Sequence, residues 1–370
     1  MQATSPLASS DLAGVIVGET ALSDVQGDSG SLNYRGTPIA DLADKPFLIV
    51  VWYLLTGDWP TNAEHQQLAQ FMRSQQALNN TEIALLQAVP EGTHPMLVLQ
   101  GLIPLLNPVE EGPLAPAANQ GLAIAAKISA LIAALFRKEQ GLTAITELPE
   151  TDFHRRFLFM LRGELPRDDE VATLDTTQIL QMEHSFNAGT FAGRVCASTE
   201  APLQSVISAS VGTLYGRLHG GADQAALAMA REIGDPAAAA KWVNQRLAQG
   251  QKIMGMGHRE YRTLDPRAAI LKPMALARCT EPNSRKLLDT LVAVEEACQA
   301  AFAERGREIH ANVEFYKGAV FNSLGIPDHY FTALFAMARV YGYIAHFLEF
   351  KQHSRLIRPR AKYIGTVPSQ

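Results

Sequence analysis

The chain has 370 residues, of which 47% are hydrophobic and 19% charged, and its formal net charge is −5 at pH 7. This composition is ordinary for a globular protein with a sizeable core, and the length predicts two domains or one large one. The slightly acidic balance argues against nucleic acid or an anionic membrane as partners. Cys196, Cys279 and Cys298 fit no zinc or CxxC pattern, which is typical of reduced thiols in a cytoplasmic protein.

Two segments were considered as targeting or membrane signals. Residues 1–12 are small and polar, without a basic region followed by an apolar one, so no signal peptide is indicated. The segment is also not rich in arginine, which argues against a mitochondrial presequence. The most apolar stretch, residues 121–136, is interrupted by Lys127 and is too short for a membrane span. We therefore expect a buried helix there and no membrane partner.

The predicted elements are almost all helical. Near the N-terminus, the alternating pattern and the glycines of residues 13–34 predict a small hairpin region. Beyond it, apolar residues recur at helical spacing, and Gly57-Asp58-Trp59-Pro60 ends the first such run. Helices are predicted over residues 45–55, 62–78, 81–89, 96–106, 118–136, 153–161, 176–198, 203–215, 221–232, 237–248, 284–305 and 331–350. The fold class predicted by these patterns is all-α.

Glycine-rich breaks suggest where the chain divides into domains. The signals are Gly216, Gly220-Gly221 and Gly325-Ile326-Pro327. They predict a discontinuous large domain of residues 1–221 and 326–370, and a small mobile domain of residues 222–325. The candidate residues His258 and Glu314 fall in the small domain, whereas His184, Arg339 and Arg358 fall in the large one. If these residues act together, the site lies in a cleft that closes over its substrates.

Two histidines stand in settings that suit acid–base chemistry. His219 precedes Gly220-Gly221 and a helical run, and a helix N-terminus favours a neutral imidazole and binds anions. A purely structural histidine near the helix start is the alternative. His258 ends the segment Gly255-Met256-Gly257-His258, where glycines let a large ligand approach the backbone. A glycine-rich turn is the alternative, and because no strand is predicted before it, a Rossmann motif is not supported.

Several cations could bind carboxylates. Arg259, Arg262 and Arg267 follow His258 closely, as anion-binding groups or as solvated charges. Arg339 lies within an apolar helical run, so a buried guanidinium there needs an anionic partner. Arg358 belongs to the basic stretch 351–362, which is either a solvated charge run or a carboxylate clamp. That stretch lacks the interleaved aromatic residues typical of single-strand nucleic-acid binding.

A metal centre was also considered. His184 could in principle join His219 and His258 as a ligand, but no HExxH or similar spacing is present. We therefore expect no metal ion.

The motifs taken in order resemble the citrate synthase family. The segments that carry the resemblance are EHSFNAGTFAGRVCAST (183–199), LHGGAD (218–223), IMGMGHREYRTLDPRA (253–268), NVEFYKG (312–318), FAMARVYGYIAHFLE (335–349) and RPRAKYIG (358–365). Residues 14–36, with Tyr34-Arg35-Gly36, are similar to the N-terminal segment of the family. The resemblance covers nearly the whole chain.

The resemblance implies an all-α homodimer and an acyltransferase. Its reaction would condense acetyl-CoA, or propionyl-CoA, with oxaloacetate and then hydrolyse the thioester to give citrate or 2-methylcitrate and CoA. Acyl-CoA would be a substrate, and neither a permanently bound cofactor nor a metal is implied. The alternative is a divergent relative that uses another acyl-CoA and 2-oxo acid, or that binds without turnover.

The resemblance also implies roles for individual residues. His219 would polarise the thioester carbonyl, Glu314 would take the α-proton, and His258 would protonate the 2-oxo acid carbonyl. Further contacts would come from His184, Arg267 and Arg339 to the oxaloacetate carboxylates, from Arg358 of the partner subunit, and from Ile253, Met254, Gly255, Met256, Gly257 and Arg259 to CoA. This chain differs from the family at Glu314, where the family has Asp, at Lys317, where it has a small residue, and at Arg217, where it has Pro.

Overall fold

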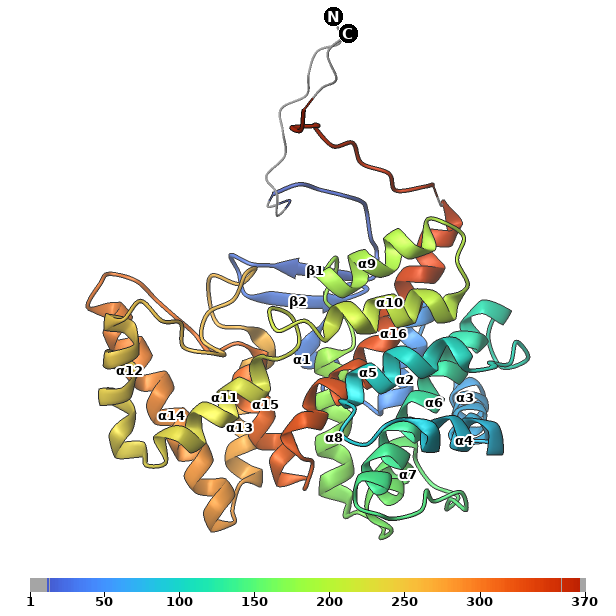
Figure 1. Ribbon diagram of the computed structural model, residues 1–370, viewed down its shortest axis with the longest axis horizontal. Helices are drawn as coiled ribbons and strands as arrows, with labels where there is room; N and C mark the ends of the chain where they lie inside the picture. Colours follow the sequence, from blue (N-terminus) through green and yellow to red (C-terminus); the bar gives the residue numbers. More distant parts are fainter. Residues whose placement is uncertain (1–11, 13, 354, 367–370) are drawn as a thin grey trace, which may run out of the picture.

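The structure, a computed structural model, describes residues 12, 14–353 and 355–366. The polar segment 1–11 and Ala13, where the predicted hairpin region starts, lie outside the described residues. The rest is mostly helical, as Figure 1 shows, which confirms the predicted all-α class. The strands are β1 (Ser23–Gln26), β2 (Ser31–Tyr34) and β3 (Thr37–Pro38). The helices are α1 (Ile39–Leu42), α2 (Phe47–Thr56), α3 (Asn62–Gln75), α4 (Asn80–Ala88), α5 (Pro95–Leu102), η1 (Ile103–Leu105), α6 (Pro116–Glu139), α7 (Phe153–Arg162), α8 (Asp168–Gln181), α9 (Ala188–Ala197), α10 (Leu203–Leu214), α11 (Ala222–Ile233), η2 (Pro236–Ala238), α12 (Ala239–Ala248), α13 (Pro266–Arg278), α14 (Pro282–Ala303), α15 (Val313–Ser323), η3 (Asp328–Tyr330) and α16 (Phe331–Gln352).

Two long apolar helices, α6 and α16, form the centre of the core and pack against each other. By length and composition, α6 and the stretch Asp328–Gln352 could each cross a membrane. However, 83% and 94% of their most apolar windows are buried inside the protein. Both are therefore core helices of this fold, and α6 contains the buried helix predicted from residues 121–136.

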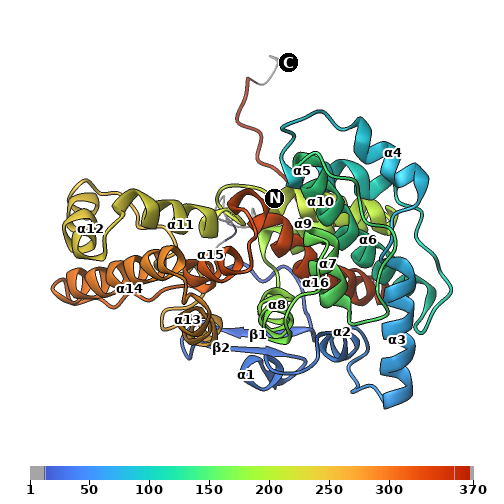
Figure 2. The ribbon, with the colours of Figure 1, turned by 90° about the horizontal axis from the view of Figure 1, so that it is seen from below.

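Helices α11 to α15 lie together at one end of the molecule in Figures 1 and 2, and the remaining helices lie at the other. The chain then returns through η3 into α16, which runs through the larger group (Figure 2). The small antiparallel sheet lies beside the boundary between the groups, with α13 next to α1.

The turn of the β1–β2 hairpin packs on the loop that carries His258. Strand pairing puts Ser23 opposite Tyr34 and leaves residues 27–30 as the turn. The Arg262 N–H donates to the Gly27 carbonyl at 2.9 Å. A Cβ atom added at Gly27 would lie 2.1 Å from the Glu260 carbonyl oxygen, so only glycine allows this close approach.

One predicted helix is wrong, and the helices α1, α13, α15 and η3 were not predicted. The helix predicted over residues 176–198 is interrupted between α8 and α9, where Ser185 has a φ of 51° and Asn187 caps α9. The helices α13 and α15 were not predicted, for different reasons. Pro273 interrupts the pattern of α13, and α15 is buried on nearly all sides, so it has no polar stripe to reveal its period.

Candidate active site

His219 lies in the connection between α10 and α11, two residues before the N-cap Gly221. Its Nε2 is 3.3 Å from the backbone N of Gly189 and 3.2 Å from Oδ1 of Asn187, both at the start of α9. Burial, together with the charges of Arg339 and Lys317, lowers the pKa of the imidazole to about 4. The ring is therefore neutral near pH 7, the state that can donate a hydrogen bond without carrying charge.

His258 is held in one tautomer by its own loop. Its Nδ1 accepts from the backbone N–H groups of Glu260 and Tyr261, at 3.0 and 3.1 Å. In the neutral ring the proton therefore sits on Nε2. Burial and the neighbouring Arg267 lower the pKa of His258 to about 4, and Arg267 Nη2 lies 3.4 Å from Nε2. Nε2–H of His258 and Nη2 of Arg267 are therefore two hydrogen-bond donors that lie side by side.

Arg267 is fixed by a carboxylate that the sequence reasoning missed. Its Nε and Nη2 donate to Oδ1 and Oδ2 of Asp265 at 3.0 and 2.9 Å, and both side chains are buried. Although burial opposes ionisation, Arg267 holds the pKa of Asp265 below its usual value. Oδ2 also accepts from the Val313 N–H at 3.0 Å, which joins α13 to the start of α15. The Asp-Pro pair at a helix start could have revealed Asp265.

Glu314 occupies the first turn of α15. Its backbone N–H donates to Oδ1 of the N-cap Asn312 at 2.9 Å, and Nδ2 of Asn312 donates to the Gly257 carbonyl at 2.8 Å. The carboxylate is buried, and its Oε2 lies 2.6 Å from Nζ of the fully buried Lys317. Glu314 is therefore connected through Asn312 to the loop of His258.

Arg339 lies in the middle of α16 and is 1% exposed. Its Nε donates to the Gln181 carbonyl at 2.7 Å, and its guanidinium lies 4.9 Å from the centre of the Phe335 ring. Glu183 is a buried carboxyl group close enough to feel the charge of Arg339. Against the effect of burial, His346 and then Arg339 lower the pKa of that buried carboxyl.

His184, in the break between α8 and α9, completes the cluster. Its Nε2 lies 3.1 Å from the hydroxyl of Tyr261, and its ring centre is 5.6 Å from that of His258. Burial lowers its pKa well below the usual value, and Arg267, Arg339 and His258 add to the effect. Tyr261, like Asp265, was not singled out from the sequence.

The structure thus brings together His184, His219, His258, Arg267, Glu314 and Arg339, from both groups of helices. The CoA-loop candidates lie beside them: Ile253 and Gly255 are buried, Met254, Met256 and Gly257 are half-buried, and Arg259 is exposed. Gly255 and Gly257 have positive φ, and Met256 pairs with Ala311 next to the cap of α15. Arg358 is exposed in the extended segment that leaves the helical body in Figure 1, and no hydrogen bond or ion pair joins it to this cluster within the described chain. The exposed Arg217 precedes His219.

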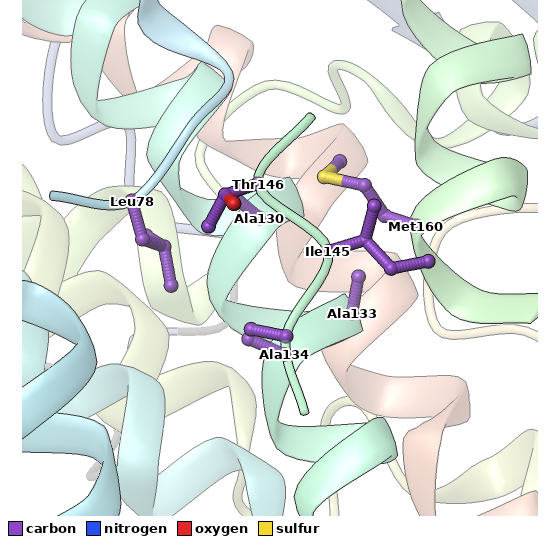
Figure 3. A pocket seen from close by; sticks show the side chains of 8 residues that line it. Leu78, Ala130, Ala133, Ala134, Ile145, Thr146 and Met160 are labelled. Carbon is purple, nitrogen blue, oxygen red and sulfur yellow. The ribbon is translucent and has the colours of Figure 1, made fainter. Parts of the chain in front are cut away.

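Two other features lack the groups that a metal centre or an acid–base site would need. Within residues 12, 14–353 and 355–366, no group of three or more His, Cys, Asp or Glu side chains could hold a metal ion. The pocket in Figure 3 lies against α6 and residues 144–146. Its lining, Leu78, Ala130, Ala133, Ala134, Ala144, Ile145, Thr146 and Met160, contains no ionisable side chain, so acid–base chemistry has no basis there.

Known structures and sequences show to what class this fold and site belong. The citrate synthase from Thermoplasma acidophilum, solved as a ternary complex with carboxymethyl coenzyme A and oxaloacetate, superimposes with a TM-score of 0.89 at 29% identity over 96% of both chains. The citrate synthase from Thermotoga maritima gives 0.87 at 31% identity, again over 96% of both chains. The fold is therefore that of the citrate synthases.

Sequence comparison identifies the family. The family model "Citrate synthase, C-terminal domain" matches residues 11–360. A 2-methylcitrate synthase from Mycobacterium tuberculosis is 36% identical over 96% of this chain and 90% of its own, and a citrate synthase from Deinococcus radiodurans is 32% identical over 96% and 95%. The chain belongs to the citrate synthase family, which confirms the resemblance drawn from its motifs.

Proposed function

We propose that the protein condenses an acyl-CoA with oxaloacetate and hydrolyses the thioester, giving citrate from acetyl-CoA or 2-methylcitrate from propionyl-CoA. The observation that carries this proposal is the cluster of two neutral imidazoles, one buried carboxylate and two buried arginines around one site. Membership of the family supports the same reaction, since relatives named for both products are similar to this chain along nearly its whole length.

The proposed mechanism assigns one proton step to each group. Glu314 removes the α-proton of the acyl thioester while the neutral His219 stabilises the enol oxygen with a hydrogen bond. The enol carbon attacks the 2-oxo carbonyl of oxaloacetate, and Nε2–H of His258 protonates the oxygen that becomes the alcohol. Water then releases CoA from the thioester. A neutral imidazole that is fixed in the site donates a hydrogen bond in a better direction than a water molecule does. It also adds no charge to the site.

The proposed binding groups are cationic, as a dicarboxylate requires. Arg267 and Arg339 would each hold a carboxylate of oxaloacetate with help from His184, because guanidinium groups bind carboxylates in two-point contacts. The loop with Ile253, Met254, Gly255, Met256, Gly257 and Arg259 would contact CoA, where the positive φ of its glycines exposes backbone groups. Acyl-CoA is a substrate here, and the proposal includes no resident cofactor or metal.

Three further parts of the proposal concern the assembly. Residues 222–325 would form a small domain that closes on the large one (1–221 and 326–370), since α11 to α15 lie together at one end of Figure 1. The protein would be a homodimer, in which the exposed Arg358 reaches the partner's site. It would act in the cytoplasm, where its three free cysteines stay reduced.

The test is CoA-thiol release by the purified protein, with oxaloacetate and either acetyl-CoA or propionyl-CoA. Turnover with one of them is expected, and the ratio of the two rates separates citrate from 2-methylcitrate formation. One methylene in the acyl pocket changes selectivity by only about 1–3 kcal/mol, so both substrates belong in the assay. His258→Ala serves as the inactive control. No release with either thioester would refute the proposal.

A further inference from the structure

Glu314 has one more rotatable bond than an aspartate would have, so its carboxylate needs an anchor to act as a base. A reacting group misplaced by about 1 Å can lose roughly 100-fold in rate. The anchor lies one turn along α15, where Nζ of Lys317 is 2.6 Å from Oε2 of Glu314. Side chains three residues apart share one face of a helix, so the pair is built into α15 itself.

Lys317 is itself fixed from outside α15. Its ammonium donates to Oε1 of Gln181 at 3.0 Å and lies 4.3 Å from the centre of the Phe335 ring. The amide of Gln181 is oriented in turn, because its Nε2 donates to the Thr177 carbonyl at 2.9 Å. A buried lysine with these partners is held by α8 and α16, both in the larger group of helices.

We propose that Lys317 is the positioning residue of the base: it holds the Glu314 carboxylate at a fixed place relative to α8 and α16. This inference rests on the proposed condensation. The charged and titratable groups around the pair are Arg339, whose guanidinium shares the Phe335 ring with Lys317, and His219, whose ring also contacts Phe335.

The position of Lys317 serves both protonation states that the reaction needs. An adjacent ammonium favours the ionised form of a carboxyl group. The same charge disfavours the protonated form of His219, after the larger effects of burial and Arg339. One buried cation therefore lies next to the Glu314 carboxylate and also favours the neutral form of His219.

The experiment is a double-mutant cycle on CoA-thiol release. Lys317→Met should lower kcat about 10- to 100-fold with little change in the KM for oxaloacetate. Glu314→Asp should also lose activity, because the shorter carboxylate no longer reaches Lys317. In the Glu314→Asp background, adding Lys317→Met should cost less than about threefold, since the contact is already lost.

Two further variants separate positioning from stability. Lys127→Met is the matched control, since Lys127 is also mostly buried and also pairs with a buried glutamate, Glu82, at 2.7 Å, but lies in α6 away from the site. It should lower the melting temperature and leave kcat unchanged. Gln181→Met removes the anchor of Lys317 while keeping the charge pair, and should lower kcat about 10-fold even if Lys317→Met fails to fold.

The outcomes are distinguishable. An unchanged kcat in Lys317→Met or Gln181→Met overturns the positioning role, as does an equal loss from Lys317→Met in both backgrounds. If Glu314→Asp is more active than the wild type, the longer carboxylate is no adaptation and the proposal is wrong. A wild-type protein that releases no CoA thiol refutes the condensation itself, and the role of Lys317 falls with it.

Discussion

The two sides of the candidate site are held by different means. On one side, His258, Arg267 and Glu314 are fixed by short polar side chains and backbone groups of loops and helix caps, chiefly Asp265 and Asn312. On the other side, Arg339 is fixed by burial within the core helix α16. The loop side belongs to the smaller group of helices. The helix side cannot move without disturbing the core, because close-packed interiors resist displacement.

The largest expected effect comes from removing the carboxylate of Asp265, which holds the loop side together. Asp265→Ala leaves the buried Arg267 without its carboxylate and the Val313 N–H without its acceptor. Breaking a buried pair on one side costs about 3–5 kcal/mol of the free energy of unfolding, and CoA-thiol release should be lost. Denaturant titration measures the first effect. Asp169→Ala removes an exposed carboxylate from Arg278 and should cost much less stability, because exposed ion pairs are screened by solvent. Equal losses of the free energy of unfolding in Asp265→Ala and Asp169→Ala would show that the buried pair is no more important than the exposed one.

A shift of the loop side as a unit should follow from Gly27→Ala. The added Cβ would meet the Glu260 carbonyl oxygen at 2.1 Å, so the loop that orients His258 must move. We expect kcat to fall about 100-fold, which corresponds to about 2.7 kcal/mol, with a smaller loss of stability. Gly101→Ala is the control, because a Cβ at Gly101 would meet nothing within 4 Å. Unchanged activity in Gly27→Ala would show that the hairpin does not position His258.

Acid should weaken the fold through the histidines of both sides. The pKa values of His219 and His258 are lowered to about 4 in the folded protein, mainly by burial, against about 6.5 in an unfolded chain. Between these values the unfolded state binds more protons, so the free energy of unfolding falls as the pH decreases from about 6.5 to 4. Each histidine should contribute about 3 kcal/mol. Urea titrations of His219→Asn and His258→Asn should show a shallower pH dependence, and those of the exposed His353→Asn should not.

The smallest effect is expected at Arg358, which belongs to neither side within one chain. If it binds oxaloacetate in the partner's site, Arg358→Ala should raise the KM for oxaloacetate about 10-fold and leave stability unchanged. The exposed neighbour Arg360→Ala is the control. Mixing Arg358→Ala with His258→Ala subunits should restore activity with the low KM for oxaloacetate, because each hybrid dimer has one intact site. No recovery in the mixture would place Arg358 outside the partner's site.

The sequence predicted the helical class and most of the helices, because the apolar residues of an amphipathic helix recur at helical spacing. It failed where helices lack a polar stripe or are interrupted. The break at Ser185 and the helices α13 and α15 belong to this group, and they carry or border His184, Arg267 and Glu314. The motifs predicted the site residues. Apart from Arg358, these residues lie close together within one chain.

Local structure follows directly from the order of residues. The N-cap at Asn312, the proline after Asp265 and the glycines beside His258 each act within a turn or two of the chain. Tertiary structure alone decided which distant groups complete the site. Lys317 meets Gln181 across 136 positions of sequence, and Gly27 receives the loop at Glu260. Such pairs depend on how whole helices pack, and no local spacing encodes them. The physical reason is that burial, which sets the charge of these groups, is a property of the assembled core.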